Sequence, residues 1–253
     1  MLFRIIKKNK IMPKTPKWMA DAFEALFSGS YHPVQVTYTE MLTKTFKKVR
    51  FEGDLSKIKK HFSAGNIIEF RVSDTQFRHY TPSYFNQEKG VCEVLFYVHN
   101  QGVGSKWVEQ LKVGDNYKLI GPGGKTALRT DVDFHFIFGD ETSLGLMECL
   151  TREIPENYYC LAELDDKNLN IADELDFEIE TCKKSTINKA QYAIEKTKEF
   201  LNNYQGNKEN IAFYLTGNAK SIANLRNTLT KLGINQKTQI QTEPYWVEGK
   251  QGL

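Results

Sequence analysis

The chain has 253 residues, of which 40% are hydrophobic and 26% are charged, and its formal net charge is +3. This composition excludes a wholly disordered chain, and the 7 prolines and 17 glycines exclude fibrous and low-complexity classes. The charge is unevenly divided, because residues 1–128 carry a net charge of +9 and residues 129–253 a net charge of −6. We therefore predict two units with different partners.

The cysteines and histidines predict no metal centre. No two of the four cysteines lie at metal-ligand spacing, and the five histidines form no HxxxH pair. So few cysteines favour a reducing compartment. No apolar run approaches the ~18–20 residues that cross a bilayer, and the basic N-terminus lacks the apolar core of a signal peptide. We expect a soluble cytoplasmic monomer that binds no nucleic acid and inserts into no membrane.

The first half predicts one helix followed by a small barrel. Apolar residues recur at helical spacing over 15–28, and Gly29 ends the pattern. Six segments rich in β-branched and aromatic residues follow: 34–42, 47–53, 66–74, 78–85, 91–100 and 115–121. Six short antiparallel strands indicate a closed barrel. A helix over about 105–111 interrupts them between the fifth and sixth strands.

The second half alternates between strand and helix patterns. The predicted strands are 134–139, 158–164, 176–181, 211–217 and 238–244, and the predicted helices are 143–153, 188–203 and 219–232. Such alternation predicts a parallel sheet covered on both faces. The fold class is therefore a β-barrel plus α/β. We place a barrel domain with its N-terminal helix at 1–128 and an α/β domain at 129–253.

The fourth predicted strand carries a possible cofactor site. Arg78 and Tyr80 point to one face of this strand, and His79 and Thr81 point to the other. An arginine beside a tyrosine offers a bidentate phosphate clamp next to a flat aromatic surface, which suits a ligand with a diphosphate and a tricyclic ring. A core tyrosine and a solvated arginine would give the same pattern, so both interpretations stay open.

Residues 98–107 contain the end of a predicted strand, a glycine-containing loop and the start of the predicted barrel helix at Ser105. N–H groups at a helix start favour an anion, and the glycines let a phosphate approach closely. Ser105 either caps the helix or donates its hydroxyl to the phosphate. The alternative is a plain capped helix that Trp107 anchors to the barrel.

Residues 138–143 follow the first parallel strand, where dinucleotides bind in α/β domains. The segment lacks the GxGxxG fingerprint, and Asp140 and Glu141 would repel a pyrophosphate if they pointed inward. The two carboxylates could instead cap the next helix through its dipole. Near the chain end, Tyr245 and Trp246 either cover a core edge or form the wall of a planar cofactor site.

Six short motifs in order resemble the siderophore-interacting proteins, which are FAD-dependent ferric-siderophore reductases within the ferredoxin–NADP reductase superfamily. The motifs are RHYT, YVHNQGVGSKW, LKVGD, LIGPGG, FGDETS and PYWVEG, and the resemblance covers about residues 32–250. It implies a flavin-binding barrel followed by a domain that resembles those that bind NAD(P)H. It also implies that FAD carries the chemistry, so we nominate no catalytic side chain and no metal ligand.

The resemblance also assigns roles in the FAD site. It implies that Arg78 contacts the diphosphate, that Tyr80 packs on the isoalloxazine and that Thr81 hydrogen-bonds near its reactive edge. His99 and the loop 102–105 would hold the ribityl and pyrophosphate parts. The complete set of expected cofactor contacts is Arg78, His79, Tyr80, Thr81, Val98, His99, Gly102, Gly104, Ser105, Trp107, Thr142 and Trp246.

The implied reaction passes electrons from NADH or NADPH through FAD to Fe(III) in a siderophore or another iron chelate, and it releases Fe(II) for iron assimilation. Asp165 and Asp166 follow the second parallel strand, where an acidic residue suits a ribose 2′-hydroxyl and favours NADH over NADPH. These carboxylates could also belong to a solvated turn. A ferredoxin-type donor is a further alternative.

Basic residues are the expected contacts of the anionic chelate. The candidates are Lys44, Lys47, Lys48 and Lys250, and the alternative is that they are solubilising surface lysines. Two other functions remain open for the chain. One is an FAD electron-transfer module that serves a protein partner such as ferredoxin, and the other is a non-enzymatic protein that binds an iron chelate.

Overall fold

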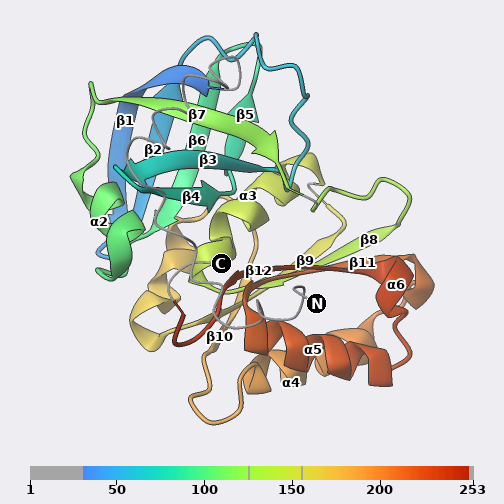
Figure 1. Cartoon of the computed structure of the whole chain (residues 1–253). Helices are drawn as coiled ribbons and strands as arrows, with labels where there is room; N and C mark the ends of the chain where they lie inside the picture. The colour runs from blue at the N-terminus through green and yellow to red at the C-terminus, as the bar shows by residue number, and fades with distance from the viewer. Residues whose placement is uncertain (1–30, 125, 155, 251–253) are drawn as a thin grey trace, which may run out of the picture.

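The computed structural model of the protein describes residues 31–124, 126–154 and 156–250 (Figure 1). The helix predicted at 15–28 lies outside the described residues. The first sheet consists of β1 (Tyr31–Thr43), β2 (Phe46–Glu52), β3 (Ile67–Ser73), β4 (Gln76–Tyr80), β5 (Tyr84–Asn86), β6 (Val91–Tyr97) and β7 (Asn116–Gly123). Helix α2 (Gly102–Gln110) connects β6 to β7 and begins three residues before the predicted helix.

The strands pair antiparallel in the order β4-β3-β7-β1-β2-β6-β5. The single strand predicted over 78–85 is wrong, because the chain breaks at Pro82 into β4 and β5 at opposite edges of the sheet. Tyr80 pairs with Ile68 of β3, whereas the Ser83 N–H donates to Glu93 O of β6 (2.9 Å). Proline has no N–H for a ladder, so it favours such a break. The sheet is barrel-like, but it is not the closed barrel that we predicted.

The first sheet encloses an aromatic core. Inward-facing residues of β2, β3 and β6 are fully buried, and α2 adds Trp107, whose ring lies 5.4 Å from that of Phe70 and 6.0 Å from that of Phe96. Burying a large apolar side chain stabilises the fold by ~1.5–3 kcal/mol. Helix α2 is therefore packed firmly against the sheet and beside β3.

The second half forms a five-stranded parallel sheet, as predicted. Its strands are β8 (Phe134–Gly139), β9 (Tyr158–Leu164), β10 (Glu180–Lys183), β11 (Ile211–Asn218) and β12 (Ile240–Trp246). Their order is β10-β9-β8-β11-β12, so the strand order reverses between β8 and β11. The third strand differs from the predicted 176–181, because Phe177 and Ile179 pack against the core before the ladder begins at Glu180.

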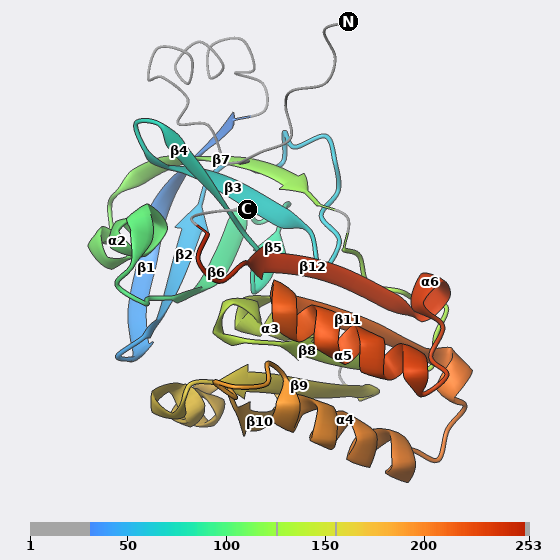
Figure 2. The ribbon, with the colours of Figure 1, turned by 60° about the horizontal axis from the view of Figure 1, so that its bottom comes forward.

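Helices cover both faces of this sheet (Figure 2). Helix α3 (Leu144–Glu153) lies between the sheet and the barrel, and α4 (Gln191–Asn203) and α5 (Ala219–Lys231) cover the other face. The sequence did not predict the short helix α6 (Gln236–Gln239) or the 3-10 segments η2 (Glu141–Ser143), η3 (Asp166–Glu174) and η4 (Lys208–Asn210).

The two sheets share one core at their junction. Phe46 and Leu95 of the barrel belong to the same buried cluster as Leu144 and Met147 of α3. The segment after β7 also contacts β12, because Gln241 donates its amide Nε2 to Ala127 O (3.0 Å). The carboxyl end of β12 also reaches the barrel, because Tyr245 Oη lies 3.0 Å from Thr81 Oγ1 (Figures 1 and 2).

Within the described ranges, no helix is long and apolar enough to cross a membrane, and no group of His, Cys, Asp and Glu is arranged to hold a metal ion. Cys92, Cys149, Cys160 and Cys182 are buried and unbridged.

Candidate functional site

The RHYT segment places a guanidinium and a phenol on one side of β4. The Arg78 guanidinium donates to Phe77 O (2.7 Å) and to Gln76 Oε1 (2.9 Å). The Tyr80 ring stacks on Trp107 with centroids 6.0 Å apart, and it meets Phe96 edge to face at 4.7 Å. Burial raises the pKa of Tyr80 well above its usual range, so its hydroxyl stays protonated at neutral pH.

The start of α2 lies directly against these two side chains. A Cβ at Gly104 would lie 3.1 Å from Tyr80 Oη and 3.4 Å from Arg78 Cγ, so only glycine leaves this close approach unhindered. Gly102 has a positive φ of 74° and open space around it. Gln101, the N-cap residue, makes no side-chain cap, so the first N–H groups of α2 remain available to an anion.

Ser105 does not cap the helix. Helix α2 begins at Gly102, and Ser105 Oγ accepts from the N–H groups of His99 (3.1 Å) and Asn100 (2.9 Å). These bonds fix the loop between β6 and α2 and leave the Ser105 hydroxyl proton to donate elsewhere. His99 is exposed, and Val98 is buried with its N–H on Thr45 O (2.7 Å).

His79 lies apart from Arg78 and Tyr80. Its Nε2 is 2.6 Å from Glu69 Oε2 on the neighbouring strand β3, and this hydrogen bond raises the pKa of His79. The ring is exposed and occupies the alternate face of β4.

The second sheet meets the RHYT segment at Thr81. Thr81 is buried, and its Oγ1 lies 3.0 Å from Tyr245 Oη at the end of β12. A Cβ at Gly145, in the first turn of α3, would lie 3.1 Å from Thr81 O. Sequence reasoning missed Gly145, for which the only available signal was a glycine inside a helix pattern. This contact brings the turn before α3, which includes Thr142, next to the barrel strand.

Asp140 organises that turn. Its carboxylate is almost completely buried, and Oδ1 accepts from the N–H (2.9 Å) and the hydroxyl (2.5 Å) of Thr142. Oδ2 accepts from Trp246 Nε1 at 2.7 Å. Burial raises the pKa of Asp140, while Lys184 and these donors oppose the rise. Asp140 therefore caps η2, directly before α3, and fixes Trp246, whereas neither it nor Glu141 caps α3 as one of our interpretations held.

Glu141 connects three segments that are distant in the sequence. It accepts from Lys184 Nζ, from the Asp165 N–H (2.8 Å) and from Asn168 Nδ2 (2.9 Å). The Lys184 ammonium also lies 5.7 Å from the centre of the Trp246 ring. Sequence reasoning missed Lys184 and Asn168, because no local pattern links either residue to Glu141. Asp166, the other acidic residue of this loop, pairs with Lys183 at 3.2 Å.

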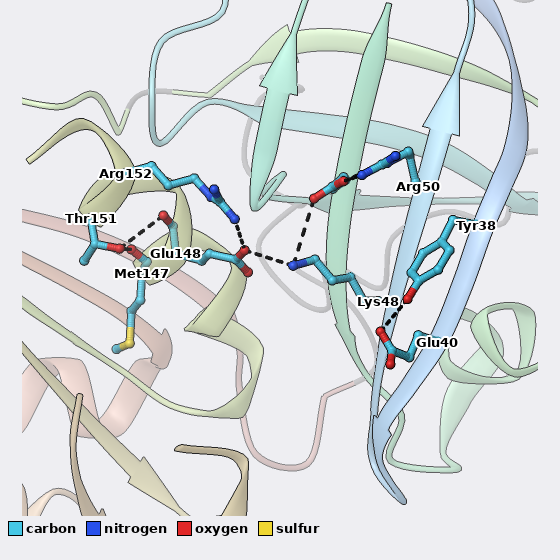
Figure 3. Close-up of polar contacts among 9 residues, drawn as sticks. Tyr38, Glu40, Lys48, Arg50, Met147, Glu148, Thr151 and Arg152 are labelled. Carbon is cyan, nitrogen blue, oxygen red and sulfur yellow. Dashed lines mark hydrogen bonds and ion pairs between the residues drawn. The ribbon is translucent and has the colours of Figure 1, made fainter. Parts of the chain in front are cut away.

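The four candidate lysines are in different environments. Lys44 and Lys250 are exposed, whereas the buried Lys47 Nζ donates to the carbonyl oxygens of Val108, Glu109 and Leu111 at the end of α2. Lys48 reaches from β2 toward Glu148 on α3, with Nζ and Oε1 3.2 Å apart, and Glu148 also accepts from Arg152 (Figure 3). We therefore do not propose Lys47 or Lys48 as substrate contacts.

This arrangement of an antiparallel barrel-like sheet and a parallel sheet defines a ferredoxin reductase-like fold. It superposes on the ferredoxin reductase of carbazole 1,9a-dioxygenase with a TM-score of 0.70 and 17% identity, covering 86% of this chain and 70% of that one. It superposes on a siderophore utilization protein from T. fusca with a TM-score of 0.68 and 19% identity, covering 88% and 95% of the two chains.

Comparisons of the sequence find similarity to proteins that interact with siderophores. Residues 54–126 match the model of the siderophore-interacting FAD-binding domain, so the resemblance predicted from the motifs is confirmed over this segment. The chain is also 27% identical over 183 residues to the ferric vibriobactin reductase ViuB of Vibrio cholerae serotype O1. That match covers 68% of this chain and 65% of the relative's length, so about a third of each chain lies outside it.

Proposed function

We propose that the protein is an FAD-dependent reductase that passes electrons to Fe(III) in a siderophore or similar chelate and releases Fe(II) for iron assimilation. The observation that carries this proposal is the close packing of Gly104 against Arg78 and Tyr80, which joins a cation, an aromatic ring and an open helix start. Bound FAD would take two electrons from the donor and, once reduced, would supply one electron to each of two ferric chelates.

The residues present fit an FAD diphosphate and ring system. The diphosphate would lie at the first N–H groups of α2, where Gly102 leaves space and Arg78 adds a positive charge. Tyr80, already stacked on Trp107, would offer its ring to the isoalloxazine, and Thr81 would hydrogen-bond near the reactive edge. Thr142 and Trp246 would approach from the second sheet.

The substrate is expected to be an anionic iron chelate. Lys44 and Lys250 are exposed, and none of the side-chain contacts described above involves them. We therefore propose that these two lysines attract the anionic chelate. The electrons would come from NADH, NADPH or a ferredoxin. In this proposal residues 1–128 form the FAD domain, residues 129–253 form the domain that faces the donor, and the protein acts in the cytoplasm.

The proposed FAD site is tested by the double variant Arg78→Ala/Tyr80→Ala. Loss of the charged hydrogen bonds from Arg78 weakens FAD binding by about 10–100-fold, and loss of the ring adds to this. We expect the purified variant to be colourless, whereas the wild type is yellow. The control is Arg71→Ala/Tyr192→Ala, which removes an arginine on the neighbouring strand β3 and an exposed tyrosine on α4, and it should keep its FAD.

A wild-type protein that binds no FAD and still binds ferric chelates would contradict the reductase proposal. That result would instead support the non-enzymatic chelate-binding alternative. Equal FAD content in the double variant and its control would show that the cofactor lies elsewhere.

A further inference from the structure

The carboxyl edge of the parallel sheet contains the position where dinucleotides bind in this kind of fold. The strand order reverses between β8 and β11, and ligands of open α/β sheets lie in the crevice at such a reversal. Both strands carry a glycine there, Gly139 at the end of β8 and Gly217 near the end of β11. Glycines at this position normally let a pyrophosphate approach the backbone.

In this protein the space beside both glycines is filled by its own side chains. A Cβ at Gly217, which has a φ of +94°, would lie 2.6 Å from Asp140 Cγ and 2.7 Å from each carboxylate oxygen. A Cβ at Gly139 would lie 2.4 Å from Ser143 Oγ and 3.0 Å from Thr216 Oγ1. The Asp140 carboxylate therefore occupies the volume that a pyrophosphate oxygen would need next to Gly217.

Asp140 is also held in this position by hydrogen bonds. Three donors reach its two oxygens, namely the N–H and hydroxyl of Thr142 and the indole N–H of Trp246. These bonds favour the carboxylate form, whereas burial, the largest effect, raises the pKa of Asp140. Two further carboxyl groups, Glu141 and Glu163, are buried nearby, and the Lys184 ammonium at this edge is already bonded to Glu141.

We propose that Asp140, fixed by Thr142 and Trp246, is a specificity-determining residue that excludes the pyrophosphate of a nicotinamide dinucleotide from this crevice. A dinucleotide would have to displace the carboxylate and break its bond to Trp246, and it would bring its own negative charges beside a buried one. The second sheet then discriminates against NADH and NADPH alike, contrary to the NADH preference expected from Asp165 and Asp166. This inference rests on the proposed reductase function.

The test measures NADH and NADPH binding to the FAD-loaded protein by titration calorimetry. Asp140→Asn keeps the shape and removes the charge, and its single amide oxygen can accept from Thr142 or from Trp246 but not from both. We expect its Kd for both dinucleotides to fall at least about tenfold below the wild-type value, because a like-charge contact is removed. Trp246→Phe removes one hydrogen bond that holds Asp140 in place, so it should also lower the Kd for both dinucleotides. Asp173→Asn, an exposed carboxylate on η3, should change neither.

The proposal is overturned if the wild type binds NADH as tightly as Asp140→Asn does. If Asp140→Asn does not fold, Trp246→Phe decides in the same way, and an unchanged Kd in that variant overturns the proposal. A separate arm reduces the flavin with dithionite and then adds a ferric chelate. If the reduced flavin is not reoxidised by the ferric chelate, the proposed function is contradicted. The Kd comparison tests only whether Asp140 excludes the dinucleotides.

Discussion

Glu163 on β9 gives the fold a residue-level dependence on pH. It is 3% exposed, and burial raises its pKa to about 7, although Ser221 and Lys184 oppose the rise. Since the folded state binds this proton more tightly than the unfolded chain, the associated stability is complete below the unfolded pKa of 4.5 and is lost as the pH rises through about 7. The carboxylate therefore destabilises the fold in neutral solution.

Replacing this carboxyl group should remove the pH dependence. Between pH 5 and pH 8, we expect the free energy of unfolding of Glu163→Gln to rise relative to wild type by roughly 2–3 kcal/mol. Urea denaturation at both pH values measures this difference. Glu174→Gln, at an exposed position on η3, should show the same pH dependence as the wild type. If Glu163→Gln also showed the wild-type pH dependence, ionisation of Glu163 would have no effect on the free energy of unfolding.

Sequence patterns indicated the candidate residues that a local feature marks. The RHYT segment and the glycine loop were each readable, because alternation on a strand and a glycine-rich helix start are local features. The bonds of Asp140 to Trp246 and of Glu141 to Lys184 were not predictable, since they span 106 and 43 residues. Such contacts depend on how strands are ordered in the sheet.

Among the elements, α2 owes part of its stability to a lysine on β2. Lys47 Nζ donates to Val108 O (3.0 Å), Glu109 O (3.3 Å) and Leu111 O (2.7 Å), and burial lowers its pKa. An ammonium at a helix C-terminus satisfies carbonyl groups that have no intrahelical partner and interacts favourably with the helix dipole. Lys47 thus links the β1–β2 hairpin to the helix proposed to bind the diphosphate.

Lys47→Met should therefore destabilise the protein by about 2–3 kcal/mol, because charged hydrogen bonds to buried carbonyls are lost. Thermal unfolding of the FAD-free protein measures the change. Lys44→Met, at the exposed turn of the same hairpin, should leave the melting temperature unchanged. Equal melting temperatures for the two variants would mean that water replaces the Lys47 ammonium at the end of α2.

The element boundaries show what the sequence did not determine. The predicted strand over 78–85 contains aromatic residues on both sides of Pro82, namely Tyr80 before it and Tyr84 and Phe85 after it, so its pattern looked continuous. The structure divides it because a short segment must pass from one edge of the sheet to the other. The parallel strands β8, β9 and β11 were predicted to within one residue, since apolar runs are a strong signal of burial, whereas the third strand lacks such a run and was placed too early.

For the whole molecule, the uneven charge is partly an internal feature. Several acidic residues of the second half are buried at the carboxyl edge of the sheet or at the junction, where they bond to lysines or backbone N–H groups: Asp140, Glu141 and Glu148. The pair formed by Lys48 and Glu148 joins the two halves directly (Figure 3). This ion pair therefore helps to hold the two halves together.

The central claim is that the bound flavin delivers electrons to chelated iron. The most direct measurement is a single-turnover experiment, in which the FAD-loaded protein is reduced anaerobically with dithionite, freed of excess reductant and mixed with a ferric siderophore. We predict that the oxidised flavin absorbance returns and that two Fe(II) ions are trapped for each flavin, because each Fe(III) accepts one electron. A flavin that stays reduced in the presence of the ferric chelate would contradict the account.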